Sequence, residues 1–207
     1  MLVGLQSSTL RAMPNSFSLT YDYLCPFARN VNETVVEMLR AGSSYDVRFV
    51  PFSLQENHAD EGDVAQWDLP IDAAGPGVLA LLWSIAVRDV FADAFLAFHL
   101  ALFSARHDDG ADIGDPQVLE SVARSVDIDP EALRLQVATG VPAGTLAAEH
   151  SRAVEEYGVF GVPTFIQGDE AVFVRLMDRH QPGDVENVLD MLSWANLNEF
   201  KRTSVEQ

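Results

Sequence analysis

The feature that most constrains the fold of this chain is the wide separation of its strand-like segments along the sequence. Alternation of apolar and polar side chains, the period of a β-strand, marks four segments: residues 16–23, 44–52, 162–167 and 171–176. A helical pattern from Pro26 to the stop at Gly42 joins the first two segments, which favours a parallel pair with a right-handed crossover. A Gly168-Asp169 turn joins the last two segments and predicts a hairpin.

Helical periodicity fills the interval between the two strand groups. It predicts helices over residues 75–106, as a pair or as one long helix, and over 116–126, 130–138 and 143–157, with a last helix over 183–197 after the hairpin. Asp115 and Asp129 each precede a first-turn proline and are expected N-caps. This order is that of an α/β thioredoxin fold with an all-helical insertion. We expect a thioredoxin-fold domain over 14–58 and 148–207 and a helical insertion domain over 59–147.

Charge and cysteine content exclude several classes of protein. Lys and Arg number 13 against 31 Asp and Glu, and the net charge of −18 repels nucleic acid and anionic lipid. No uncharged run approaches the roughly 20 residues that span a bilayer, so no membrane partner is expected. A single cysteine cannot form an internal disulfide and predicts a cytoplasmic location. No export segment is visible, and Met13 would also serve as a translation start.

The single cysteine, Cys25, stands where the first predicted strand gives way to the helix that begins at Pro26. Free N–H groups and the positive end of the helix dipole stabilise a thiolate at such a position. The sequence therefore predicts an exposed, nucleophilic sulfur with its pKa lowered toward about 3.5 to 7.5. The competing interpretation is a small buried hydrophobic side chain without chemistry.

A second feature is the proline that opens the third strand, in Val162-Pro163-Thr164. One interpretation is an ordinary proline at a strand start. The other is a cis peptide bond that offers the Val162 backbone to an extended peptide or to a small thiol beside the cysteine. The second interpretation requires Cys25 and Pro163 to meet in space.

The segment YDYLCPFA, with Asp22, Cys25 and Pro26, resembles the D-x-x-C-P-x-C active-site segment of DsbA-like thioredoxin proteins. Three more stretches resemble that family: VRFVPFSL its next strand, ALFSARHDDGADIGDPQVL its helical insertion, and YGVFGVPTFIQGDEAVFVRLMDR its cis-proline loop and terminal hairpin. The resemblance covers residues 16–195. It extends to actinobacterial DsbA-like oxidoreductases, kappa-class glutathione transferases and 2-hydroxychromene-2-carboxylate isomerases.

The resemblance implies a small-thiol cosubstrate, glutathione or mycothiol, held by Asp178 and Arg179 in the segment LMDR. A surface salt bridge is the alternative role for that pair. The chain departs from the family pattern at Ala28, which replaces the second cysteine, and at Phe27, which replaces a histidine common in strongly oxidising members. The chain therefore cannot form an intramolecular disulfide, and a monothiol cycle through Cys25 is the route that remains.

We predict a thiol-disulfide oxidoreductase with Cys25 as nucleophile, no tightly bound cofactor and a small thiol or disulfide as substrate. Two alternatives stay open: a transferase or isomerase that activates glutathione or mycothiol, and a non-catalytic binding protein of the same fold. Relatives are often homodimers, although nothing in the sequence marks an interface. None of the five histidines has zinc-site spacing, and His99 lies among phenylalanines as an expected hydrogen-bonded core residue.

Overall fold

The computed structural model describes residues 16–60, 62–194 and 196. Its four strands are β1 (Ser16–Tyr21), β2 (Asp46–Pro51), β3 (Thr164–Gln167) and β4 (Glu170–Phe173). They form one sheet in the order β2-β1-β3-β4, in which β1 and β2 are parallel and the other pairs are antiparallel. This is the predicted mixed sheet, with a parallel β-α-β unit and a terminal hairpin.

Eight α-helices and two 3-10 helices occupy the described residues. They are α1 (Pro26–Arg40), α2 (Leu54–Asn57), η1 (Gln66–Asp68), α3 (Pro76–Val90), η2 (Ala92–Ala94), α4 (Phe95–His107), α5 (Pro116–Ser125), α6 (Pro130–Val137), α7 (Val141–Tyr157) and α8 (Pro182–Leu192). The segment predicted over 75–106 is a helix pair, interrupted at η2. Asp115 and Asp129 cap α5 and α6 as predicted, each by accepting a backbone hydrogen bond.

Several boundaries differ from the predicted ones for local reasons. Strand β1 ends at Tyr21 rather than at 23, because a turn follows it. In this turn the Cys25 N–H donates to the Asp22 carbonyl at 3.1 Å. Strand β3 begins at Thr164, after the proline, and β4 ends at Phe173. Helix α8 ends at Leu192, and residue 197, where the sequence places its end, lies outside the described residues.

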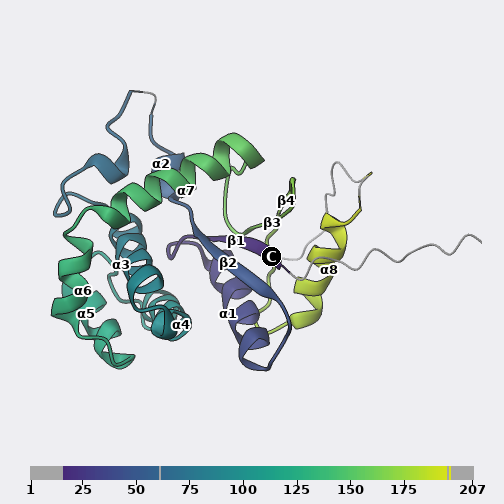
Figure 1. Cartoon of the computed structure of the whole chain (residues 1–207), viewed down its shortest axis with the longest axis horizontal. Coiled ribbons are helices and arrows are strands. Elements are labelled where there is room, and N and C mark those ends of the chain that lie inside the picture. Colours follow the sequence, from purple (N-terminus) through teal and green to yellow (C-terminus); the bar gives the residue numbers. More distant parts are fainter. Residues whose placement is uncertain (1–15, 61, 195, 197–207) are drawn as a thin grey trace, which may run out of the picture.

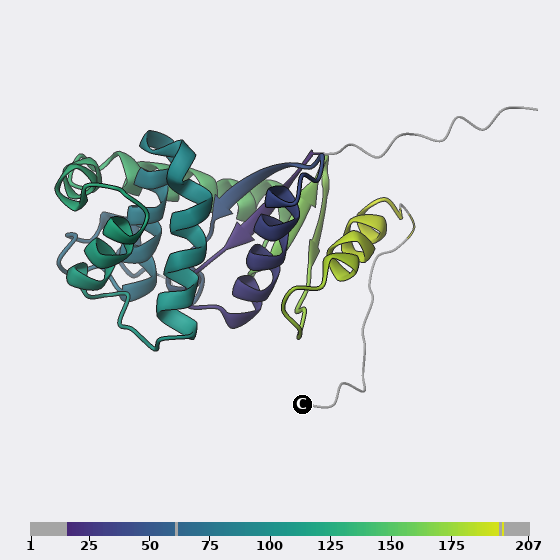
Figure 2. The ribbon, with the colours of Figure 1, turned by 90° about the horizontal axis from the view of Figure 1, so that it is seen from below.

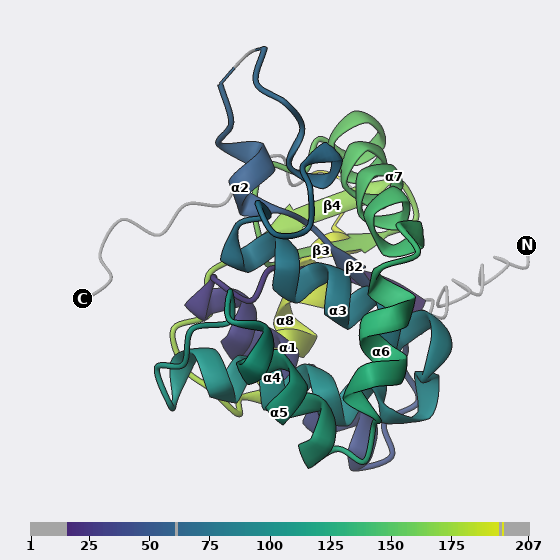
Figure 3. The same ribbon diagram turned by 90° about the vertical axis from the view of Figure 1, so that its left-hand side faces the viewer.

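The sheet lies between helices on both of its sides, beside a helical block. Helices α1 and α8 lie on one side of the sheet and α7 crosses its other side, while α3, α4, α5 and α6 gather next to it (Figures 1 and 2). Figure 3 shows α7 running from this block toward the hairpin, so one helix crosses the predicted domain boundary at 147–148. The division into a thioredoxin-fold domain and an insertion domain stays a prediction.

The core is continuous from the sheet into the helical block. Leu19, Tyr21 and Phe165 from the strands are fully buried, as are Phe98 and Phe103 from α4. Fully burying one such aromatic or aliphatic side chain stabilises the fold by about 1.5–3 kcal/mol. None of the described helices combines the length and the apolar character that crossing a membrane requires.

Candidate active site

The cysteine is the N-cap of helix α1. Cys25 has an extended backbone (φ −91°, ψ 116°), and its sulfur accepts a hydrogen bond from the Ala28 backbone N–H at 3.4 Å. Pro26 occupies the first turn, where its missing N–H leaves no gap in the helix ladder. The sulfur therefore lies at the positively polarised end of α1, as the sequence predicts.

The proline loop lies directly against this sulfur. The Val162–Pro163 peptide bond is cis, and the Cys25 thiol lies 3.4 Å from the Val162 carbonyl oxygen. The Thr164 N–H donates to Thr20 Oγ1 on β1 at 2.8 Å, which fixes the loop to the sheet. The two segments that the sequence analysis paired, 137 positions apart, thus meet in space.

The predicted exposure and acidity of the thiol are wrong. Residue Cys25 is 9% exposed rather than open, and burial raises the pKa of its thiol above the ordinary value of 9.0. Backbone N–H groups of Ala28 and Phe27 lower the pKa, but by less than burial raises it. The helix terminus does lower the pKa of the thiol, as predicted, but desolvation by burial outweighs that effect. At neutral pH the resting group is a thiol, which fits an S–H donor facing the Val162 carbonyl.

A buried carboxyl group supports the turn that carries the cysteine. Asp22 is fully buried, and its two oxygens accept hydrogen bonds from the N–H groups of Leu24 and Leu54, both at 2.8 Å. Burial raises the Asp22 pKa to about 6, because these two donors offset only part of the desolvation of the charge. When ionised, Asp22 also raises the pKa of Cys25. The sequence motif identified Asp22, but no pattern in the sequence indicated that its carboxyl group is buried.

The two residues predicted to hold a small thiol differ in their surroundings. Asp178 is exposed, and the structure gives it no ion pair with another described residue. Arg179 is engaged: its guanidinium donates to both carboxylate oxygens of Glu33 on α1, at 2.7 and 2.8 Å, and lies 3.4 Å from Asp108. Arg29 contacts the same two carboxylates. Arg179 is therefore an ion-pair residue that ties the loop after β4 to α1.

A chain of buried polar side chains runs from the insertion to the first turn of α1. The Tyr23 hydroxyl lies 2.6 Å from Ser84 Oγ and 2.7 Å from His99 Nδ1, His99 Nε2 lies 3.0 Å from Asn32 Oδ1, and Asn32 Nδ2 donates to the Ala28 carbonyl at 2.7 Å. Because Asn32 donates through its nitrogen, its oxygen accepts from His99 Nε2–H, and Tyr23 donates to Nδ1. Burial lowers the His99 pKa to about 3, so the ring is neutral. The predicted core histidine is confirmed.

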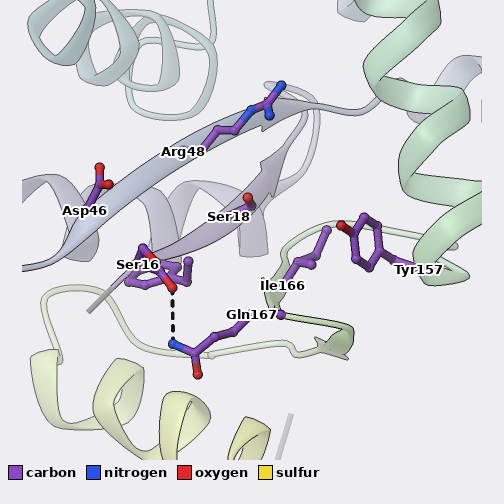
Figure 4. Close-up of a pocket in the computed structure, with 9 residues that line it drawn as sticks. Ser16, Ser18, Asp46, Arg48, Tyr157, Ile166 and Gln167 are labelled. Atoms are coloured by element: carbon purple, nitrogen blue, oxygen red, sulfur yellow. Dashed lines mark hydrogen bonds between the residues drawn. The ribbon is translucent and has the colours of Figure 1, made fainter. Parts of the chain in front are cut away.

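Several open pockets of the molecule have linings that do not include the thiol. Figure 4 shows one of about 260 Å³ at the start of β1 and β2, where Ser18, Arg48, Tyr157 and Ile166 face a common space. Gln167 donates to the Ser16 carbonyl at its rim. Arg48 is already paired with Glu149 at 3.0 Å, and Cys25 is not among the residues that line this pocket. Among the described residues, no cluster of three or more His, Cys, Asp or Glu side chains is arranged to hold a metal.

These elements define a class, the thioredoxin-fold proteins in which a thiol at a helix N-terminus faces a cis proline. Within that class, the chain belongs to the DSBA-like thioredoxin domain family, whose model matches residues 18–182. The match spans the sheet, the helical insertion and the cis-proline loop.

The chain is also similar to a curated protein and to several solved structures. YwbO of Bacillus subtilis (strain 168), described as uncharacterized, is 25% identical over 172 residues, which are 73% of this chain and 86% of YwbO. Three solved structures share the fold. They are oxidised BdbD from Bacillus subtilis (TM-score 0.59, 18% identity, 88% of this chain and 89% of that one), Pseudomonas aeruginosa DsbA (0.60, 17%, 93% and 91%) and 2-hydroxychromene-2-carboxylate isomerase (0.62, 16%, 87% and 97%). At these identities the likeness concerns the fold alone.

Proposed function

We propose that this protein is a DsbA-like thiol-disulfide oxidoreductase of the actinobacterial type that works through Cys25 alone, with a small thiol as cosubstrate. The observation that carries the proposal is the 3.4 Å approach of the Cys25 sulfur to the carbonyl of Val162, next to the cis Pro163. In this arrangement the loop backbone stands beside the atom that would react, so a disulfide bound to the loop has its sulfur within reach of the thiol.

The proposed cycle needs two exchange steps. The Cys25 thiolate attacks one sulfur of a disulfide R–S–S–R′, so that a Cys25–S–S–R bond forms and R′S⁻ leaves. A second small thiolate then attacks the sulfur of R, which forms a new disulfide and releases the Cys25 thiolate. Ala28 has no sulfur to perform the second step internally, which is why the cycle calls for a free thiol such as glutathione or mycothiol. We place this chemistry in the cytoplasm, where such thiols are abundant and where a lone cysteine stays reduced.

The remaining parts of the site have proposed roles in binding. The loop of Val162, Pro163 and Thr164 clamps the substrate beside the sulfur, with the Val162 backbone as its binding group. Asp178, exposed after β4, can pair with the ammonium group of a γ-glutamyl moiety. Arg179 holds that loop in place through Glu33. Phe27, at the first turn of α1, lines the entrance.

The test is adduct formation on the single cysteine. Incubation with oxidised glutathione at pH 8.5, followed by intact-mass spectrometry, should add one glutathionyl group to the wild type and none to Cys25→Ser. Excess reduced glutathione should then remove it, which completes the cycle. The absence of any adduct from oxidised glutathione and from a generic aromatic disulfide, in folded protein, would refute thiol-disulfide exchange.

A second candidate function is a transferase or isomerase that activates glutathione or mycothiol without being modified itself. The burial of the thiol and its raised pKa favour it, because a protonated Cys25 can donate a hydrogen bond to a bound thiolate instead of attacking. It predicts binding of reduced glutathione to both wild type and Cys25→Ser with no covalent adduct. A protein that binds a peptide or a thiol, without turnover of any disulfide, would match the non-catalytic alternative.

A further inference from the structure

An arginine side chain near Cys25, Arg175, forms no ion pair with a carboxylate of the described residues. The Arg175 guanidinium lies 5.4 Å from the ring centroid of Phe27, two residues after the cysteine, and 5.7 Å from that of Phe173. The neighbouring backbone is tied to α1, because Asn30 Nδ2 donates to the carbonyls of Leu176 and Met177 at 3.0 and 3.1 Å. Arg175 is close enough to Cys25 for its charge to lower the pKa of the thiol.

Three phenylalanine rings are linked through Arg175 and through one ring–ring contact, and we call this set the aromatic ledge: Phe27, Phe160 and Phe173. Phe160 precedes the cis-proline loop, is 65% exposed, and lies 5.0 Å from Phe173 between ring centroids. Gly161 allows this contact, since a Cβ at that position would lie 3.2 Å from the Phe173 ring. The ledge therefore links the proline loop to β4 by a ring contact, and Arg175, which lies over Phe173 and Phe27, links β4 to the helix that carries the thiol.

Its lack of an ion pair among the described residues distinguishes Arg175 from the other arginines near the site. Arg29 and Arg179 are ion-paired with Glu33 and Asp108. Arg175 is exposed and has no ion pair with any residue that the structure describes. In a chain of net charge −18, a cation left open to solvent beside a thiol is available to an anionic ligand.

We propose that Arg175 selects disulfides that carry a carboxylate, and that the aromatic ledge receives the carbon chain between that carboxylate and the sulfur. This proposal rests on the proposed function and adds the substrate class to it. A guanidinium stacked on aromatic rings keeps its outer N–H groups free to bind a carboxylate oxygen. Glutathione has free carboxylates and mycothiol has none, so the proposal favours a cosubstrate of the glutathione type.

The step that Arg175 assists is the first exchange. The Cys25 thiolate forms a bond to one sulfur of the disulfide, the S–S bond breaks, and the second sulfur leaves as a thiolate. The carboxylate bound to Arg175 takes no part in the bonds that change. Its pairing with Arg175 holds the disulfide over the ledge while the exchange takes place, so Arg175 is a specificity residue.

Three small disulfides of similar length and different charge test the proposal: 3,3′-dithiodipropionate, 2-hydroxyethyl disulfide and cystamine. The rate of adduct formation on Cys25 is measured for each by mass spectrometry at about 0.15 M salt, where charges more than about 8 Å from the site are screened. We expect the wild type to react faster with the anionic than with the neutral compound. Arg175→Gln should reduce the ratio of the anionic rate to the neutral rate by about two- to fivefold, as for an ion pair open to solvent.

The ratio is the deciding readout, because Arg175→Gln also changes the thiol pKa and so slows all three disulfides alike. Arg40→Gln is the matched control: Arg40 is exposed at the far end of α1, and its loss should leave the ratio unchanged. Arg175→Lys keeps the charge and should retain part of the preference. An equal ratio in wild type and Arg175→Gln would overturn the selectivity proposal while leaving exchange intact. Failure of every disulfide to react would overturn the proposed function, and this inference with it.

Discussion

The sulfur of Cys25 lies 3.4 Å from the carbonyl oxygen of Val162 and 3.4 Å from the backbone nitrogen of Ala28. The two contacts have opposite effects on the proton. The N–H of Ala28 stabilises a thiolate, whereas a carbonyl oxygen accepts a hydrogen bond only from the protonated thiol. Together with burial, the second contact keeps the proton on sulfur at neutral pH.

The first prediction concerns the pH dependence of thiol reactivity. Because burial raises the Cys25 pKa above 9.0, the fraction of thiolate, and with it the alkylation rate by iodoacetamide, should still be rising at pH 9. A small free thiol measured in the same buffers provides the reference and should reach its plateau at lower pH. A plateau for Cys25 at or below pH 7 would show that the helix terminus outweighs desolvation, contrary to this account.

The order of elements was predictable from the sequence because each signal is local. Period-two alternation, two Asp-Pro helix starts and the Gly168 turn depend on residues within a few positions of one another. The meeting of Cys25 with Pro163 was predictable only through the family resemblance. The acidity of the thiol was not predictable, since it depends on how far the proline loop shields the sulfur from water, and no local pattern encodes that burial.

The second prediction concerns the hydroxyl of Tyr23. It lies 2.6 Å from Ser84 Oγ and 2.7 Å from His99 Nδ1 in a fully buried setting, so Tyr23→Phe leaves two polar atoms without this partner. Such a loss costs about 1–3 kcal/mol of unfolding free energy. Denaturant titration of the folded protein measures it. Tyr45→Phe, at a half-buried ring packed against Phe17, is the control and should change stability by less than about 0.5 kcal/mol.

The ion cluster of Glu33 with Arg29, Arg179 and Asp108 is a part of the site that the sequence analysis missed. Its members come from α1, the end of α4 and the loop after β4, and no sequence spacing relates the members on different elements. A signal was present only within α1, where Arg29 and Glu33 are four residues apart. Without the fold, Arg179 could not be distinguished from a free ligand-binding arginine.

The third prediction follows from that cluster. Glu33 is 5% exposed and pairs with two guanidinium groups, so Glu33→Gln leaves both cations without their main partner. Breaking a fully buried pair costs about 3–5 kcal/mol, and because both arginines are partly open to water we expect about 1–3 kcal/mol. Thermal and denaturant unfolding measure the loss, and 1 M salt should reduce the difference from wild type. Glu37→Gln, at an exposed carboxylate on the same helix, is the control; an equal effect of both variants would contradict a special role of Glu33.

The fourth prediction concerns stability in acid and depends on His150. The ring is 5% exposed, packs 4.3 Å from Phe52 and accepts the Ser53 N–H through Nδ1 at 3.2 Å, and burial lowers its pKa from 6.5 to about 4.

Between pH 6.5 and 4 the unfolded chain therefore binds a proton at His150 that the native protein does not, so stability falls as the pH is lowered. The contribution of this one group is at most about 1.4 kcal/mol per pH unit, and we expect about 0.5–1. His99 acts in the same direction, with its pKa lowered to about 3, while Asp22 opposes both between pH 3.8 and about 6, because its raised pKa favours the native state in acid.

His150→Asn keeps an acceptor for Ser53 and removes the group that binds the proton. The unfolding free energy of this variant should therefore vary less steeply with pH between 6.5 and 4 than that of the wild type, whatever its absolute stability. His58→Asn, at an exposed ring, is the control for a histidine open to water in both states. Parallel profiles for wild type and His150→Asn would mean that His150 binds a proton equally well in the native and unfolded states, and the buried, neutral ring would have to be abandoned.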